Sequence, residues 1–140
     1  RDAREAPGAG AAGGIGVVAL GLLGAARRPG IEVVLELAGF DHRSAGADLV
    51  VTGEGSFDEQ SLGGKTPVGV AAAAAEREVP VVVVSGRRAL SREQWLAAGF
   101  LDARALTDAE PDAARCIAEA GPLLRALAHD LGTEIAAAVA

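Results

Sequence analysis

The residues of this sequence that are best suited to chemistry lie between positions 52 and 67, which read TGEGSFDEQSLGGKTP. Glu54 and Asp58 supply carboxylates, and Lys65, the only lysine in the chain, supplies a full positive charge. A helix that begins at Thr66 would add partial positive charge, and glycines let the backbone expose its N–H groups. Phosphate is stabilised at such a place, and nearby carboxylates can hold Mg²⁺ or accept a proton. The segment therefore has the groups that phosphoryl transfer needs.

The polar segment is also long for a connection inside a compact domain, which favours a functional loop. Its phosphate contacts are expected from the backbone, at Gly53, Gly55, Gly64 and Thr66. A Walker A loop is excluded, because its first glycine would have to stand at position 59, which is Glu59. The alternative is a solvated connection whose charges face water.

A second glycine-rich segment, GAGAAGGIG, covers positions 8–16. It fits the GxGxxG pattern, but no strand precedes it, so the dinucleotide fingerprint is weak. A small-residue helix that packs closely against a neighbour is the favoured interpretation. The alternative is a second anion-binding loop, with Gly10 and Gly13 as its contacts.

Other side chains give weaker signals. Arg87 follows an apolar run and suits the bidentate grip of a carboxylate or phosphate, although an exposed turn is the competing interpretation. His42 and His129 have no partners at metal-ligand spacing, which disfavours a structural zinc site. Cys116 is the only cysteine, so no disulfide forms within the chain and a reducing compartment is expected.

Short apolar runs alternate with helix signals from Asp48 onward, which predicts an α/β fold with a parallel sheet flanked by helices. Ligands bind beyond the carboxyl ends of the strands in such sheets, here positions 52–54, 85–87 and 107–108. Capping boxes at Ser91 and Thr107 predict two helix starts. The predicted strands cover residues 48–52, 79–85 and 100–106. The predicted helices cover the segment from the glycine loop to 26, then 31–37, 41–46 (helix or turn), 66–77 and 91–98. A last helix is predicted from 107 to near the C-terminus, with a break at 121–122.

The composition narrows the class of protein. The 140 residues carry a formal net charge of −6, and no basic stripe typical of nucleic-acid binding is present. Half of the residues are hydrophobic, which places the chain among folding proteins. The sequence contains no long uncharged apolar run, so no membrane-spanning helix is predicted. Because the chain starts at Arg1 without a methionine, we expect it to begin inside a longer gene product.

Three strings resemble the C-terminal portion of bacterial glycerate kinases of the two-domain type: GAGAAGGIG, ADLVVTGEGSFDEQSLGGKTPVGVA and VPVVVVSG. The resemblance implies ATP-dependent phosphorylation of D-glycerate with Mg²⁺, in the cytoplasm. It also implies two α/β domains, one of them flavodoxin-like and built from both ends of the polypeptide. Residues 1–47 would end the inserted second domain, and residues 48–140 would be the returning C-terminal piece of the flavodoxin-like, Rossmann-like domain.

The resemblance also implies roles for particular residues. Lys65 would stabilise the charge of the transferred phosphate. Asp58 would be either the base that takes the glycerate hydroxyl proton or a Mg²⁺ ligand, with Glu54 in the other role. Gln60 is an expected substrate-binding residue, as is Arg87 from its place after the second predicted strand. Many members of the family carry a basic residue where this chain has Ser56, so a substrate contact made by that residue would be lost or supplied elsewhere.

On this interpretation the partner of the chain is the missing N-terminal half of the same protein. The piece alone is expected to be inactive, and a homo-oligomer is a possible assembly. Two alternatives stay open: a non-catalytic module that binds a nucleotide or small acid, and a fragment whose alanine-rich helices make oligomer contacts.

Overall fold

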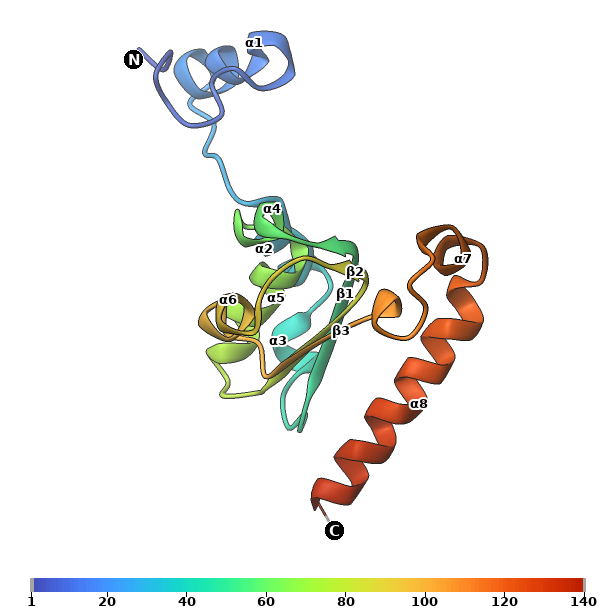
Figure 1. Ribbon diagram of the computed structural model, residues 1–140. Coiled ribbons are helices and arrows are strands. Elements are labelled where there is room, and N and C mark those ends of the chain that lie inside the picture. The colour runs from blue at the N-terminus through green and yellow to red at the C-terminus, as the bar shows by residue number, and fades with distance from the viewer. Residues whose placement is uncertain (1, 140) are drawn as a thin grey trace.

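The computed structural model describes residues 2–139, and its centre is a parallel three-stranded sheet (Figure 1). The strands are β1 (Val50–Phe57), β2 (Val81–Arg88) and β3 (Asp102–Ala105), in the order β1-β2-β3. The register places Glu54 beside Ser85, and Ser85 beside Ala105. The predicted α/β class and the parallel sheet are confirmed.

Helices surround this sheet and precede it. Figure 1 shows α5 and α6 on one face, with α7 and α8 on the other. The helical segments are α1 (Ala11–Val17), a π-helical turn (Val18–Leu22), α2 (Gly30–Leu37), α3 (Phe40–Arg43), α4 (Glu59–Leu62), α5 (Thr66–Ala75), α6 (Arg92–Ala97), a 3₁₀ turn (Leu106–Asp108), α7 (Ala113–Ala118) and α8 (Ala120–Val139).

The hydrophobic core lies between the sheet and the helices α5 and α6. Phe57 and Phe100 are fully or nearly fully buried there, with Trp95 beside them. Alanines of α5, Ala71 and Ala74, let the helix approach the valines of the sheet closely. The core therefore fixes the end of β1 and the start of α5, the two elements that flank the polar segment.

The first strand is longer than the sequence predicts. The expected strand ends at Thr52, whereas β1 continues to Phe57. Polar residues and glycines give no strand signal, but pairing with β2 supplies the hydrogen bonds, and Phe57 lies beside Arg88. Gly53 and Gly55 consequently lie within the strand. The true connection to α5 is short and contains α4.

The helix beginning predicted at Thr107 is wrong. Asp108 Oδ2 instead accepts the backbone N–H of Ala105 at 2.9 Å, which closes a 3₁₀ turn. The helix α7 begins after Asp112, whose Oδ1 accepts the N–H of Ala114 at 2.8 Å. Pro122 causes no break at 121–122, because it lies in the first turn of α8, where proline is tolerated.

Other predicted elements agree with the structure. The 31–37 helix is α2, and the capping box at Ser91 is present, with both reciprocal hydrogen bonds. The cap predicted at Thr66 is shifted by one residue, since Lys65 is the N-cap of α5. The helix predicted to reach position 26 ends at Leu22, before an extended connector.

The N-terminal segment lies apart from the sheet (Figure 1). Within α1, Ala12, Gly13 and Gly14 have left-handed backbone conformations, so the glycines form a turn before the helix proper. The helix α2, by contrast, packs beside α5, and α3 packs beside α2. The predicted division after residue 47 stays a prediction.

The fold leaves much surface uncovered. The chain exposes 9058 Å², whereas a compact protein of 13.9 kDa would expose roughly 6,700 Å². Within residues 2–139 no strand pairs with the outer edge of β1, and no helix is long and apolar enough to cross a membrane. Such an open edge invites pairing with further chain.

Candidate functional site

The carboxyl end of β1 is shaped by a capping box. Asp58 is the N-cap of α4, and its Oδ1 accepts the backbone N–H of Gln60 at 3.1 Å. In return, the backbone N–H of Asp58 donates to Ser61 Oγ at 3.2 Å. These reciprocal bonds satisfy the free donors of the helix start and hold the aspartate side chain in one orientation.

A cation from the neighbouring strand reaches this carboxylate. Arg87 of β2 lies beside Ser56 of β1 in the register, and its Nη2 donates to Ser56 Oγ at 3.0 Å. Ser56 Oγ in turn donates to Asp58 Oδ2 at 2.9 Å, and Arg87 Nη2 lies 3.9 Å from the same oxygen. The sequence predicts Asp58 and Arg87 as members of this group, and it singles out Ser56 as a departure from the family without predicting its contacts.

A second cation near Asp58 is Lys65, at the start of α5. Lys65 Nζ donates to Gln60 Oε1 at 3.4 Å, and the lysine is the N-cap of α5. The turn before it requires Gly64, whose φ of +91° lies in the left-handed region that favours glycine. Thr66 opens the helix, so the exposed ammonium group stands next to the partial positive charge of the ten-residue α5.

Asp58 is held in its charged form by these neighbours. The hydrogen bond from Ser56 is the main cause that lowers the pKa of this carboxyl, and the N–H of Gln60 adds to it. The positive charges of Lys65 and Arg87 lower the pKa further, while partial burial opposes the change. The carboxylate form of Asp58 is therefore favoured, with Lys65 and Arg87 as the neighbouring cations.

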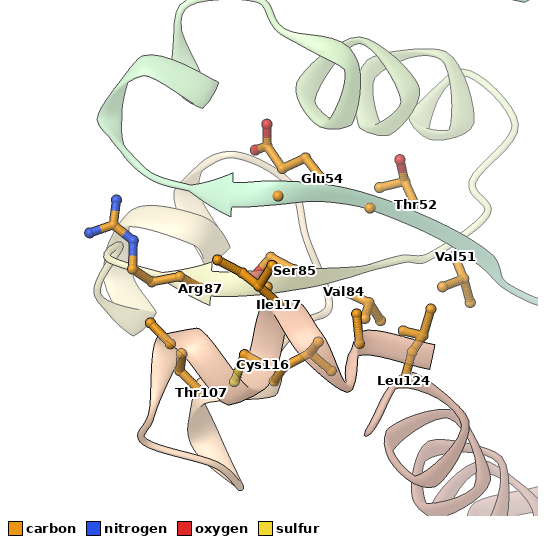
Figure 2. Close-up of a pocket in the computed structure, with 16 residues that line it drawn as sticks. Val51, Thr52, Glu54, Val84, Ser85, Arg87, Thr107, Cys116, Ile117 and Leu124 are labelled. Atoms are coloured by element: carbon orange, nitrogen blue, oxygen red, sulfur yellow. The ribbon is translucent and has the colours of Figure 1, made fainter. Parts of the chain in front are cut away.

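Glu54 lies in a different environment. It is in the middle of β1, and its Oε1 is buried without a hydrogen-bond partner in the described part of the chain. Figure 2 shows Glu54 and Thr52 on the opposite side of β1 from Val51. Asp58 comes directly after β1, four positions beyond Glu54, and four residues of extended chain span about 13 Å, so the two carboxylates lie at separate points.

A groove of about 830 Å³ lies on the other face of β1 and β2, under α7 and α8 (Figure 2). Its walls are mostly apolar: Val51, Val84, Ile117 and Leu124 line it, while Arg87 lies at the carboxyl ends of the strands. Sequence reasoning missed this groove, because its lining comes from segments that are distant in the chain.

The glycines that were expected to bind phosphate do not all lie close together in the structure. Gly64 and Thr66 lie beside Lys65, whereas Gly53 and Gly55 are strand residues. Gly10 and Gly13 belong to the N-terminal segment, which Figure 1 shows apart from the sheet. The structure thus brings together Asp58, Gln60, Lys65 and Arg87, with Gly64 and Thr66 beside them.

The arrangement of side chains that could coordinate a metal limits which metal ion could bind. Within residues 2–139, no three side chains of His, Cys, Asp or Glu gather around one point. A closed metal site of protein ligands is therefore not formed by these residues. A carboxylate such as Asp58 could still share Mg²⁺ with phosphate oxygens, which is how this ion often binds nucleotides.

The parallel sheet and its flanking helices place the chain in the class of α/β proteins, whose ligands typically bind at the carboxyl ends of the strands, where Asp58 and Arg87 lie. Comparison with known families goes further. The Glycerate kinase family matches residues 1–136, so the chain belongs to this family and the resemblance seen in the sequence is confirmed.

Individual relatives agree with this membership. The chain is 48% identical to a glycerate kinase of Bacillus cereus over 85 residues, which is 61% of this chain and 22% of the relative. It is 42% identical to a glycerate 2-kinase of Escherichia coli, again over 61% of this chain and 22% of the relative. A Mycobacterium bovis protein without an assigned function is 36% identical over 96% of this chain and 35% of its own length.

A solved structure is also similar. A crystal structure assigned to glycerate kinase 2 of Salmonella typhimurium LT2 superposes with a TM-score of 0.52 at 38% identity. The match covers 69% of this chain and 24% of that one. The chain thus spans between about a fifth and a third of the length of the relatives it matches.

Proposed function

We propose that this chain is the part of a glycerate kinase that supplies the phosphate- and substrate-binding edge for ATP-dependent phosphorylation of D-glycerate. The names of its relatives in Bacillus cereus and Escherichia coli support this activity. The observation that carries the proposal is the cluster of Lys65, Asp58 and Arg87 at the carboxyl ends of β1 and β2.

Lys65 is the proposed contact of the transferred phosphate. Its ammonium group and the start of α5 place positive charge at one point, which stabilises the negative charge that phosphoryl transfer spreads over oxygen atoms. The backbone of Gly64 and Thr66 completes this cradle. Phosphate bound here would displace the weak contact between Lys65 and Gln60, whose donor and acceptor are 3.4 Å apart.

Arg87 and Gln60 are the proposed substrate contacts. D-glycerate carries a carboxylate and two hydroxyl groups, and a guanidinium suits the carboxylate because its planar donors match two oxygens. The side chain of Arg87 is 62% exposed, so it is accessible to a small acid. The amide of Gln60 can bind a hydroxyl as donor or acceptor.

The two carboxylates have different proposed roles. The neighbours of Asp58 lower its pKa and favour its charged form, so it is the residue that would share Mg²⁺ with phosphate oxygens. Mg²⁺ bound there would neutralise charge on the phosphates. Glu54 has an oxygen without a partner in the described chain, so it is the candidate that takes the proton of the glycerate hydroxyl.

The rest of the proposal concerns the whole polypeptide. Because the chain spans a fifth to a third of its relatives, we infer that it works together with the remaining part of such a kinase, in the cytoplasm. Gly10 and Gly13 would reach the nucleotide only if the N-terminal segment packs near the sheet in that setting. Self-association is a further possibility for the uncovered surface.

Thermal shift and turnover test the proposal together. Mg-ATP and D-glycerate are added separately and jointly to the 140-residue chain, and melting temperature and ADP release are measured. A ligand present at about 100 times its Kd stabilises the folded state by about 2.7 kcal/mol, which raises the melting temperature by several degrees. ADP release that needs both ligands supports a kinase. Stabilisation without ADP release from this chain is the result expected if turnover needs the remaining part of the kinase. Stabilisation without ADP release from the longer polypeptide indicates a binding module, and no shift with either ligand contradicts the proposed site.

A further inference from the structure

Ser56 stands between the two oppositely charged residues of the site. Its Oγ accepts a hydrogen bond from Arg87 Nη2 at 3.0 Å and donates one to Asp58 Oδ2 at 2.9 Å. The guanidinium and the carboxylate are themselves 3.9 Å apart, which is longer than a hydrogen bond. The hydroxyl of Ser56 therefore bridges the two charged side chains directly.

The two partners depend on this hydroxyl to different degrees. Asp58 has a second anchor, because its Oδ1 accepts the N–H of Gln60. For Arg87, the bond to Ser56 is the one hydrogen bond that its guanidinium makes within residues 2–139. Loss of the hydroxyl would thus release the arginine, while Asp58 stays in place as the cap of α4.

Ser56 itself is well fixed. Its backbone lies in β1 beside Arg87, and its carbonyl oxygen accepts a hydrogen bond from Ser61 Oγ at 3.3 Å. Ser61 is fully buried, so this contact does not exchange with water. A rigid backbone behind a short side chain gives the hydroxyl little freedom to move.

We propose that Ser56 is a positioning residue, which orients the guanidinium of Arg87 toward the carboxylate of D-glycerate. This deepens the proposed function and rests on it. One donor of Arg87 is used by Ser56, and the remaining N–H groups are free to bind two carboxylate oxygens. A flexible arginine loses much side-chain freedom on binding a ligand, and prior orientation reduces that cost.

The first test needs no ligand. The Nε–Hε signal of Arg87 is recorded by ¹⁵N NMR in the 140-residue chain and in the variants Ser56→Ala and Ser56→Thr. We expect Ser56→Ala to move and sharpen this signal as the side chain becomes mobile, and Ser56→Thr to preserve it because a hydroxyl is retained. Ser91→Ala is the matched control, because it removes a helix-capping serine from α6 without touching Arg87. An Arg87 signal that is identical in the wild type and Ser56→Ala would overturn the positioning role.

The second test measures recognition by isothermal titration calorimetry. We expect Ser56→Ala to weaken D-glycerate binding about tenfold, with Mg-ATP binding changed less than twofold and Ser56→Thr close to the wild type. Equal losses for both ligands, or unchanged D-glycerate binding, would contradict a role in substrate recognition. If the wild type binds no D-glycerate, the proposed function and the recognition role both fail, while the NMR measurement alone decides whether Ser56 orients Arg87.

Discussion

Phe57 and Phe100 meet edge to face, with ring centroids 5.2 Å apart and planes at 79°. Phe57 is the last residue of β1 and immediately precedes Asp58, while Phe100 precedes β3. The contact therefore ties the end of β1, which precedes the site, to the segment before β3, the strand at the other edge of the sheet. Because both rings are buried, it is the part of the core on which the position of Asp58 depends most directly.

We expect Phe57→Ala to lower the free energy of unfolding by about 3–5 kcal/mol, because it removes a fully buried ring and leaves a cavity. Urea denaturation followed by circular dichroism measures the change. Leu101→Ala is the control, since Leu101 is 60% exposed and its loss should cost less than about 0.5 kcal/mol. Similar midpoints for Phe57→Ala and the wild type would show that this ring is not central to the core.

Two glycines in helices should respond in opposite ways to the same substitution. A Cβ on Gly69 of α5 would lie 2.5 Å from Cγ1 and Cγ2 of Ile31, a stiff side chain of α2. A Cβ on Gly132 of α8 would meet open space. We expect Gly69→Ala to destabilise the chain by about 1–3 kcal/mol. Gly132→Ala should stabilise it by about 0.5–1 kcal/mol, since alanine restricts the unfolded chain.

Both glycine variants are compared by thermal unfolding at matched protein concentration. The informative quantity is the sign of each change, because the two substitutions add the same methyl group. If Gly69→Ala also raises the melting temperature, α2 does not pack against α5 as closely as the contact requires. That result would also weaken the view that α2 belongs with the sheet.

The sequence predicts most elements where a local signal exists. Ser91 and Gln94 form the predicted capping box, and Gly99, with φ of +89°, ends that helix as expected. Elements that depend on distant pairing were not predictable in this way. The strand continues through Gly53 and Gly55 because β2 pairs with it, and no local pattern reveals that partner.

The residues of the candidate site were likewise predictable only where a local signal exists. Lys65 and Asp58 stand out by charge, and a short turn keeps them near each other in sequence and in space. Ser56 is an ordinary residue type whose importance comes from Arg87, 31 positions later in the chain. The Oε1 atom of Glu54 likewise stands out because it is buried without a hydrogen-bond partner in the described chain, and burial cannot be read from the sequence.

Cys116 should be a slow-reacting thiol. It is 5% exposed, its S–H donates to the carbonyl of Glu110, and burial is the main cause that raises its pKa. Iodoacetamide at pH 8 should therefore modify it at least about tenfold more slowly than in urea, because the thiolate is the reactive form. The double variant Cys116→Ala, Leu101→Cys provides an exposed comparison thiol.

The same thiol gives a pH dependence with a defined sign. A pKa that is higher in the folded state means that the unfolded chain loses the proton first as pH rises. The contribution of Cys116 to stability is thus complete below about pH 8.5 and is lost as pH rises through the folded value. Urea midpoints at pH 7, 8.5 and 10 should fall more for the wild type than for Cys116→Ala. A parallel decline in both proteins would contradict this assignment.

We expect Lys65 to contribute far more to ligand binding than to the free energy of unfolding. Its side chain is exposed, and within residues 2–139 its one side-chain hydrogen bond is the long contact with Gln60, so Lys65→Ala should change the free energy of unfolding by less than about 0.5 kcal/mol. Removal of a charged group that contacts phosphate should nevertheless weaken Mg-ATP binding roughly tenfold or more, because charged hydrogen bonds contribute about 1.5–3 kcal/mol. Calorimetric titration of each variant with Mg-ATP measures this effect. Arg125→Ala is the control, because it removes the same charge from the distant helix α8. Equal weakening in both variants would mean that net charge, and not the position of Lys65 at the start of α5, attracts the nucleotide.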